Sequence, residues 1–458
     1  MGLNRLGGQR SFHDQTSYRP LGQSSPQKGE FLPVKSIWKR DAAQASALPV
    51  ALAALIGVLA SGAASCAEYR TDSANVPVRQ RQHPEADPTG LAYDGILFYP
   101  SVLAGMEFDS NIYASSRNPA EDMAFVLAPE LRIRSESEST KHTFDLGARH
   151  RQYQSFDSEN RTEAHARLTS ARQLATDVRL DTLFEAARKF EARGSSVTSP
   201  VAAKPIAYRD LRAETTVTKT FNRLGVAVGG GIRSLAFEDS ETFAGAPLEQ
   251  GFRDGTIITA SVKPFYDISP GYRAYTLLKA NRRNYEGKGD LNRDSEGYDA
   301  RAGLEFSLTS MLFGSFELGY LKQSYSNSLI PDADGLSTKA DLHWLMTPLM
   351  TVSLFGSRQV AELAAQDQEA RIDLTVGARV DYELRRDLIA SVETAYTNEE
   401  FTGSNRQDDI LQIGTQIDYM MNPYCSFGLK YSYFERNSNI ADFSFDRHLM
   451  MLNVTAQY

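Results

Sequence analysis

The sequence is poor in cysteine and in long apolar runs. Its 458 residues contain two cysteines, and only residues 48–64 approach the length of a membrane-spanning helix. A helical membrane protein with several spans needs about 20 mostly apolar residues for each span. Two cysteines provide neither a disulfide framework nor a thiolate metal cluster. These absences exclude a polytopic helical membrane protein and a disulfide-stabilised scaffold.

The chain also lacks an excess of positive charge. Its 49 basic and 57 acidic residues give a formal net charge of -8. Nucleic-acid binding requires a basic surface that displaces counterions from phosphates, so we predict no nucleic-acid partner. A mean hydropathy of -0.38 with 41% hydrophobic residues leaves a soluble protein or a β-barrel.

Motifs for catalysis and metal binding are missing. The seven histidines show no His-x-x-x-His or His-Glu-x-x-His spacing, and there is no Gly-x-Ser-x-Gly elbow. The run Gly229-Gly230-Gly231 lacks the Gly-Lys-Ser/Thr of a phosphate-binding loop. We therefore predict that the protein is not an enzyme and that it has no catalytic residue, metal site or cofactor.

The one apolar stretch has the layout of an export signal. It follows Lys35, Lys39 and Arg40 and ends in the small residues before Ala67. Cleavage after Ala67 is the preferred interpretation, and a membrane anchor or a lipidated Cys66 are the alternatives. Three parts are predicted: an N-terminal extension with a signal peptide (1–67), a periplasmic lead-in or linker (68–93) and a barrel (94–458).

From residue 94 onward the chain repeats one unit, a stretch of alternating apolar and polar side chains followed by a break. Ile372, Leu374, Val376, Ala378 and Val380, for example, alternate with polar or small residues. A period of two is typical of a strand with one apolar and one wet face. Eighteen such segments are predicted in residues 94–458. Residues 162–192 are also rich in helix-forming residues, and a helix there would reduce the count to sixteen.

The breaks alternate between short and long. Short ones occur near Asn222, Pro270 and Pro348, whereas long polar ones occupy ranges such as 191–206 and 239–253. Tight turns at one end and long loops at the other are typical of an outer-membrane barrel, and a soluble β-sandwich has no reason to show this alternation. We predict an all-β fold, a closed antiparallel transmembrane β-barrel in outer-membrane lipid.

If the apolar face meets lipid, the opposite face lines a lumen of mixed charge. A patch of four arginines on two neighbouring strands, Arg132, Arg134, Arg149 and Arg151, is the best candidate for an anion-preferring track. The other predicted lumen-lining residues are Arg167, Arg179, Arg233, Lys263, Arg273, Arg301, Arg379, Asp373 and Asp381. We expect most of these charges to form cross-strand pairs. Residues 68–92, which are charged and rich in proline, are hypothesised to gate the lumen.

Two motifs resemble known outer-membrane proteins. The last strand ends at Tyr458 and is similar to the C-terminal signal read by the barrel assembly machinery. The stretch Asp109-Ser110-Asn111-Ile112-Tyr113 resembles the Asp-x-Asn-Ile-Tyr element of a family of outer-membrane β-barrel porins, over about residues 94–458. Members of that family are often associated with exopolysaccharide secretion loci.

This resemblance implies a protein of the bacterial outer membrane that serves as an export conduit. The implied cargo is exopolysaccharide, and the implied partner is a periplasmic polysaccharide export protein. A general diffusion porin for small hydrophilic solutes is the first alternative. A structural or adhesive barrel with a plugged lumen is the second.

Overall fold

The computed structural model describes residues 76–195, 201–361, 370–402 and 404–458. The predicted signal peptide and the first residues of the predicted lead-in lie outside the described residues. Within the described part of the chain, no helix is long and apolar enough to cross a membrane.

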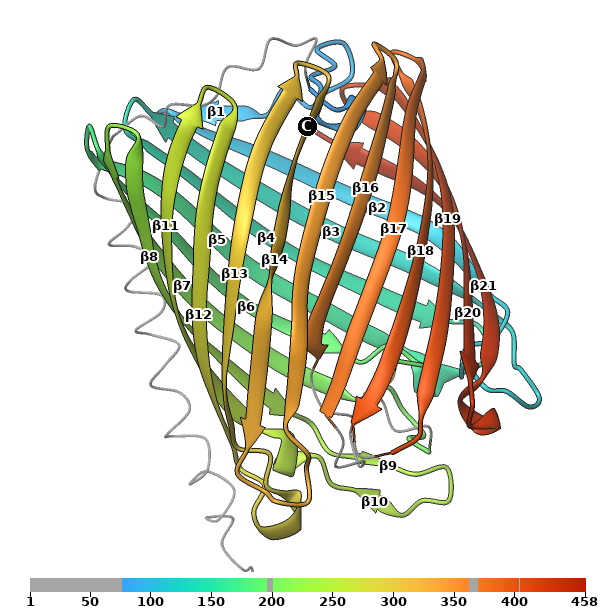
Figure 1. Cartoon of the computed structure of the whole chain (residues 1–458). Helices are drawn as coiled ribbons and strands as arrows, with labels where there is room; N and C mark the ends of the chain where they lie inside the picture. The colour runs from blue at the N-terminus through green and yellow to red at the C-terminus, as the bar shows by residue number, and fades with distance from the viewer. Residues whose placement is uncertain (1–75, 196–200, 362–369, 403) are drawn as a thin grey trace, which may run out of the picture. The chain divides into compact units, whose positions relative to one another are not determined.

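Eighteen antiparallel strands close into a barrel (Figure 1). They are β2 (Ile96–Asp109), β3 (Asp122–Ser137), β4 (Thr140–Tyr153), β5 (Arg161–Ala175), β6 (Val178–Phe190), β7 (Ala207–Phe221), β8 (Leu224–Phe237), β11 (Gly255–Ser269), β12 (Tyr272–Tyr285), β13 (Ser295–Thr309), β14 (Leu312–Tyr325), β15 (Ala333–Thr347), β16 (Met350–Ala361), β17 (Ala370–Arg385), β18 (Leu388–Thr402), β19 (Gln407–Asn422), β20 (Cys425–Ser438) and β21 (Phe445–Gln457). The first of them, β2, pairs with the last, β21, with Val102 opposite Ala456. The predicted eighteen-stranded barrel is therefore confirmed.

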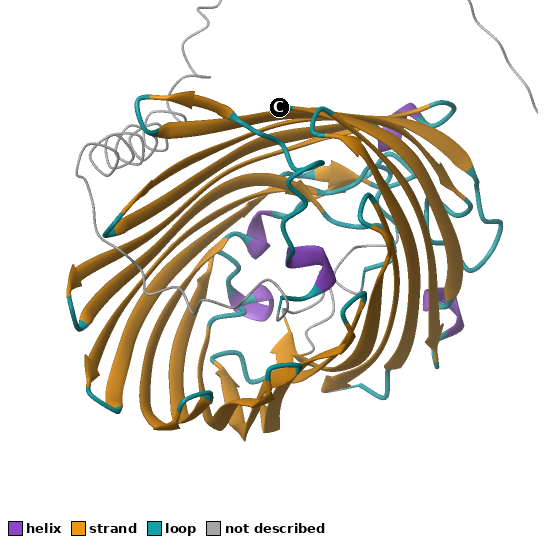
Figure 2. Ribbon diagram, turned by 90° about the horizontal axis from the view of Figure 1, so that it is seen from above, coloured by secondary structure: helices purple, strands orange, loops and turns teal. Residues whose placement is uncertain are grey.

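The remaining elements are short. They are β1 (Leu91–Tyr93), which pairs with the start of β2, the hairpin of β9 (Ser240–Glu241) and β10 (Pro247–Leu248), and the 3-10 helices η2 (Val78–Gln80), η3 (Asp157–Glu159), η4 (Gly251–Arg253), η5 (Gly289–Leu291) and η6 (Ala441–Phe443). Seen from above, loops and short helical turns lie inside the ring of strands (Figure 2).

Residues 162–192 form strands and not a helix. In β5 and β6, Ala166 lies opposite Ala186 and Leu168 opposite Phe184. Both strands also pair with their outer neighbours β4 and β7. Because tertiary pairing on both sides supplies hydrogen-bond partners to the backbone of these strands, it overrides the helix propensity of the alanine, arginine and glutamate residues.

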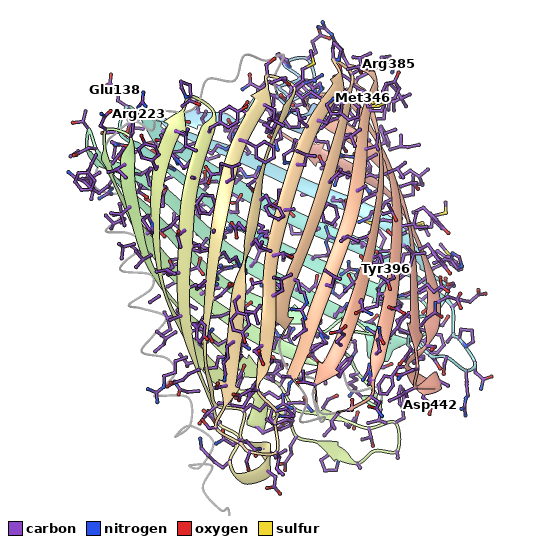
Figure 3. The ribbon with its side chains drawn as sticks, in the orientation of Figure 1. Glu138, Arg223, Met346, Arg385, Tyr396 and Asp442 are labelled. Atoms are coloured by element: carbon purple, nitrogen blue, oxygen red, sulfur yellow. The ribbon has the colours of Figure 1, made fainter. Side chains whose placement is uncertain are left out.

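All tight connections lie at one end of the barrel. Each hairpin there has two residues between its strands, such as Asn222-Arg223 and Pro270-Gly271. Asn222 and Gly271 have φ of 57° and 83°, a left-handed conformation that asparagine and glycine adopt most readily. In Figure 3, Arg223 and Arg385 mark this short-turn end, and Asp442 marks the opposite, long-loop end.

The outer surface of the barrel is apolar, and its ends carry aromatic rings. Exposed outward side chains include Leu452 (60%) and Val392 (49%). Tyr266 and Trp344 are exposed toward the short-turn end, and Tyr298 and Tyr396 toward the long-loop end (Tyr396 in Figure 3). An apolar outer surface between two aromatic girdles matches the hydrocarbon core of a bilayer and its two headgroup layers.

The described residues contain no large apolar core. Three small buried clusters, around Ile112, Ile206 and Ile330, lie beneath the long loops. Elsewhere the stability of the barrel rests on strand pairing and on polar contacts across the lumen wall.

Candidate functional site: the lumen and its N-terminal segment

The lumen wall is held together by ion pairs of two kinds. In one kind, an arginine and an acid stand two residues apart on one strand and therefore point to the same side, as do Arg301 and Asp299. In the other, the partners lie on neighbouring strands, as Arg132 and Asp145 do at 2.5 Å, or on the next strand but one, as Lys263 of β11 and Glu305 of β13 do at 2.8 Å. These pairs leave much of the wall close to neutral.

Most of the predicted lumen-lining residues take part in such pairs. The contacts are Arg132 with Asp145, Arg151 with Glu107 and Glu163, Arg179 with Asp181, Arg233 with Asp210, Lys263 with Glu305, Arg273 with Asp267, Arg301 with Asp299 and Glu317, Asp373 with Arg371, and Asp381 with Arg79 and Arg379.

The predicted four-arginine patch is divided among different partners. Arg132 and Arg151 form the ion pairs above, and the guanidinium carbon of Arg134 lies 5.5 Å from the centre of the Tyr99 ring. The side chain of Arg149 makes no hydrogen bond or ion pair with any described residue. The patch is therefore no cluster of four free cations.

A second free cation, Arg167, shares a cavity with Arg149. In register Arg167 lies opposite Asp145 and Glu185, whose carboxylates are already bound by Arg132 and Lys189. The cavity has a volume of about 690 Å³. Among the described residues, neither of its two guanidinium groups has a partner, so both are available to an anionic group in the lumen.

Residues 76–88, hereafter the lumen segment, enter the barrel from the short-turn end. Proline residues at 77, 84 and 88 prevent regular strand or helix formation, and one helical turn, η2, is all that forms. Val78 at its start is fully buried, and its N–H donates to Oγ1 of Thr351 on β16 over 3.0 Å. The segment is thus packed against the lumen wall.

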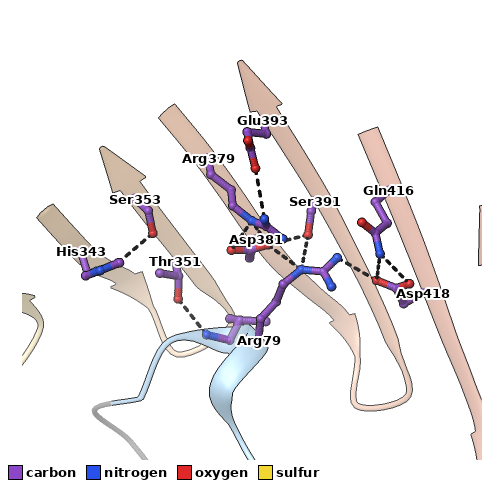
Figure 4. A network of polar contacts seen from close by, with 11 residues as sticks. Arg79, His343, Thr351, Ser353, Arg379, Asp381, Ser391, Glu393, Gln416 and Asp418 are labelled. Atoms are coloured by element: carbon purple, nitrogen blue, oxygen red, sulfur yellow. Dashed lines mark hydrogen bonds and ion pairs between the residues drawn. The ribbon is translucent and has the colours of Figure 1, made fainter. Parts of the chain in front are cut away.

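Arg79 connects this segment to three strands (Figure 4). Its Nε donates to Oδ1 of Asp381 on β17 (2.9 Å) and to Oγ of Ser391 on β18 (2.8 Å), and its Nη2 contacts Oδ2 of Asp418 on β19 (2.7 Å). Charge-assisted hydrogen bonds of this kind are about twice as strong as neutral ones.

Arg81 makes a second set of contacts. Its Nη1 lies 3.2 Å from Oε2 of Glu383 and also donates to the carbonyl of Pro348 in the turn between β15 and β16. Its Nε donates to the carbonyl of Val76, which closes the segment on itself. Two cations therefore neutralise acids at the short-turn end of the β17–β19 wall.

The sequence predicts that Asp381 faces the lumen, but it does not assign Arg79, Arg81 or Glu383 to a site. The available signal was an Arg-x-Arg pair between prolines in a segment already suspected of gating. No local pattern could pair it with acids about three hundred residues away.

The Asp-x-Asn-Ile-Tyr element lies at the other end of the barrel. Asp109 accepts from Nε of Arg447 (2.9 Å) and from the N–H of Asn111 (3.0 Å), and Nδ2 of Asn111 donates to the carbonyl of Asp446 (3.0 Å). Ile112 follows in a buried cluster. The motif therefore ties the first long loop to the last strand.

Buried arginine–carboxylate pairs hold other long loops. Arg193 pairs with Glu159, and Arg253 pairs with Glu191; all four side chains are almost fully buried. Burial raises the pKa of the Glu191 carboxyl even though Arg253 lowers it.

This chain is similar to several solved structures at low identity. OpdL of Pseudomonas aeruginosa is 12% identical, with a TM-score of 0.41, over 80% of this chain and 99% of that one. OccAB4 of Acinetobacter baumannii is 12% identical, with a TM-score of 0.43, over 82% and 100%. OccK2 (OpdF) of Pseudomonas aeruginosa, solved with glucuronate, is 10% identical, with a TM-score of 0.43, over 81% and 100%.

The family comparison is more specific. No curated protein matches the sequence. The model of the family described as Putative beta-barrel porin 2 matches residues 83–458, which include all eighteen barrel strands and the second half of the lumen segment. This chain belongs to that family and is an outer-membrane β-barrel porin of the bacterial outer membrane.

Proposed function

We propose that this barrel is an export conduit whose lumen segment closes the periplasmic end until a partner displaces it. The short-turn end of an outer-membrane barrel faces the periplasm. The observation that carries the proposal is the contact of Arg79 with three strands, because a segment held there occupies space that a solute must cross.

The proposed cargo is a hydrated polysaccharide, delivered by a periplasmic polysaccharide export protein. Two features support it. An eighteen-stranded barrel is wide enough for an aqueous channel, and its wall is polar with paired charges. The family resemblance supplies the link to exopolysaccharide. Arg149 and Arg167 are proposed to favour acidic groups on the passing chain, and the other predicted lumen residues to keep the wall hydrated.

The test is single-channel conductance in a planar bilayer, comparing the full chain with a variant that lacks residues 76–88. We expect the full chain to be mostly closed and the deletion to conduct steadily, because the segment no longer fills the periplasmic end. Equal conductance of the two proteins would contradict the gate. Large steady steps from the full chain would favour the general diffusion porin, and silence from both folded proteins would favour the structural barrel.

The same bilayers test the two free arginines. In the deletion variant, Arg149→Ala with Arg167→Ala should lower the anion-to-cation permeability ratio measured from the reversal potential. Replacing Arg233 together with its partner Asp210 is the matched control, because the net charge of the wall then stays the same. An unchanged ratio in the double variant would remove these arginines from the proposed path.

A further inference from the structure

One sector of the lumen wall differs from the rest in its chemistry. On β11–β14 many lumen side chains bind one another, as where Lys263 pairs with Glu305 and the hydroxyl of Tyr275 donates to Glu317. On β18–β20 neutral amides and hydroxyls replace much of that charge. Together with Lys430 and the ion pair of Arg379 with Glu393, they line a cavity of about 320 Å³.

The registers of β18, β19 and β20 arrange these groups in successive rungs. The rung nearest the periplasm contains Ser391, Gln416 and Lys430 as direct neighbours. Two residues farther along each strand, about 7 Å away, lies a second rung. It contains Glu393, Gly414 and Ser432.

The second rung has bare backbone at Gly414, and the third rung adds an aromatic ring. A Cβ built on Gly414 would meet nothing closer than the carbonyl oxygen of Tyr431 at 4.0 Å, so the backbone there is bare. In the third rung Gln412 is paired with Phe434, whose ring is fixed by stacking on Phe445 at 5.2 Å.

Several polar side chains of this sector have no partner. The side chains of Gln412, Lys430 and Ser432 make no hydrogen bond or ion pair with any described residue. Gln416 uses its amide nitrogen on Asp418, which leaves its amide oxygen as an acceptor. The cavity thus offers both donors and acceptors next to an apolar ring, the combination that recognises a polyhydroxylated ligand.

We infer that the β18–β20 wall is a binding track for a saccharide chain and that Arg79 occupies its periplasmic entrance. The inference rests on the proposed export function and names the residues that would meet the cargo. Ser391 belongs both to the track and to the contacts of Arg79, and Asp418, which Arg79 also contacts, is bound by Gln416 of the track (Figure 4). Saccharide and lumen segment therefore compete, because the hydroxyls of the first sugar need the groups that hold the guanidinium.

Competition has a measurable consequence. A ligand and a segment that exclude each other are linked, so weakening the segment strengthens the apparent affinity for the ligand. Arg79→Ala should raise the affinity of the full-length barrel for maltohexaose, measured by saturation-transfer NMR in detergent. Adding Gln412→Ala and Gln416→Ala should lower that affinity about tenfold, a change of about 1.4 kcal/mol in binding free energy.

Asn281→Ala in the Arg79→Ala protein is the matched control. Asn281 is also an amide of the wall, but it lies on β12 and is bound by Arg283. Its loss should leave the affinity unchanged. Equal affinity of the Gln412/Gln416 variant and the control would overturn the track. A heat-modifiable gel mobility identifies any variant that has not folded, in which case Ser432→Ala replaces it.

The gate and the track can fail separately. If Arg79→Ala stays closed in the bilayer while maltohexaose binding depends on Gln412 and Gln416, the track stands and the gate is wrong. If Arg79→Ala conducts but maltohexaose neither binds nor blocks the current, the gate stands and the track is wrong.

Discussion

At the scale of single residues, the lumen wall depends on glycines that make room for rings. A Cβ on Gly225 would lie 2.1 Å from the ring of Phe265 on the neighbouring strand, and one on Gly303 would lie 2.3 Å from the ring of Tyr275. In both pairs the ring lies over bare backbone. At Gly225 close packing of the Phe265 ring therefore explains the glycine.

Gly225→Val should destabilise the barrel by about 1–3 kcal/mol, because the added side chain must displace the Phe265 ring. The measurement is the unfolding free energy in urea, followed by tyrosine fluorescence and gel mobility. Gly230→Val on the same strand is the control, since the nearest atom to its Cβ is a carbonyl oxygen at 3.7 Å. Similar losses for the two variants would show that strand propensity, and not the ring, is responsible.

At the scale of elements, strands and turns were predictable and the segments between them were not. The period of two and the short breaks located all eighteen strands, because each strand must alternate between lipid and lumen. Residues 162–192 stayed ambiguous because helix-forming residues there also alternate. The lumen segment has no period at all, and its contacts depend on walls distant in sequence. Lumen-facing charges could be named, but their partners could not.

The first long loop provides a test at this scale. Arg447→Ala leaves the carboxylate of Asp109, which is 1% exposed, buried without its counter-charge. Breaking a buried pair in this way costs about 3–5 kcal/mol. We expect loosening at the β2–β3 loop, measured as faster protease cleavage there with the barrel intact.

Two variants separate charge from shape in this test. Asp109→Asn combined with Arg447→Ala should recover part of the loss, since no ionised group remains uncompensated. Arg117→Ala removes an exposed ion pair between the same loop and Asp442 and should have little effect on protease cleavage. If Arg117→Ala loosens the loop as much as Arg447→Ala, the buried pair is not its anchor.

At the scale of the whole molecule, closure depends on the last residues of the chain. The N–H of Tyr458 donates to the carbonyl of Pro100 on β2, and its ring lies 5.6 Å from that of Tyr424. The predicted role of Tyr458 as an assembly signal remains a proposal. Its outward position, with 43% of the residue exposed, leaves the ring accessible to an assembly factor.

Tyr458→Ala should reduce the amount of folded barrel in the outer membrane of cells severalfold, because a recognition group is lost. The same protein refolded in detergent should have nearly unchanged stability, since the residue is 43% exposed and not part of a buried cluster. Equal losses in cells and in detergent would assign Tyr458 to stability instead of recognition. Tyr424→Ala, which removes its ring partner, is the matched control.

The contacts of the lumen segment bear on the order of events during biogenesis. Residues 76–88 emerge from the translocation machinery before any strand, yet the groups that hold them lie 267 to 339 residues later in the chain. Long-range contacts of this kind form late, because closing such a loop has a large entropic cost. We therefore expect a newly made barrel to exist first with an empty periplasmic entrance, and its lumen segment to be the last part to find its place.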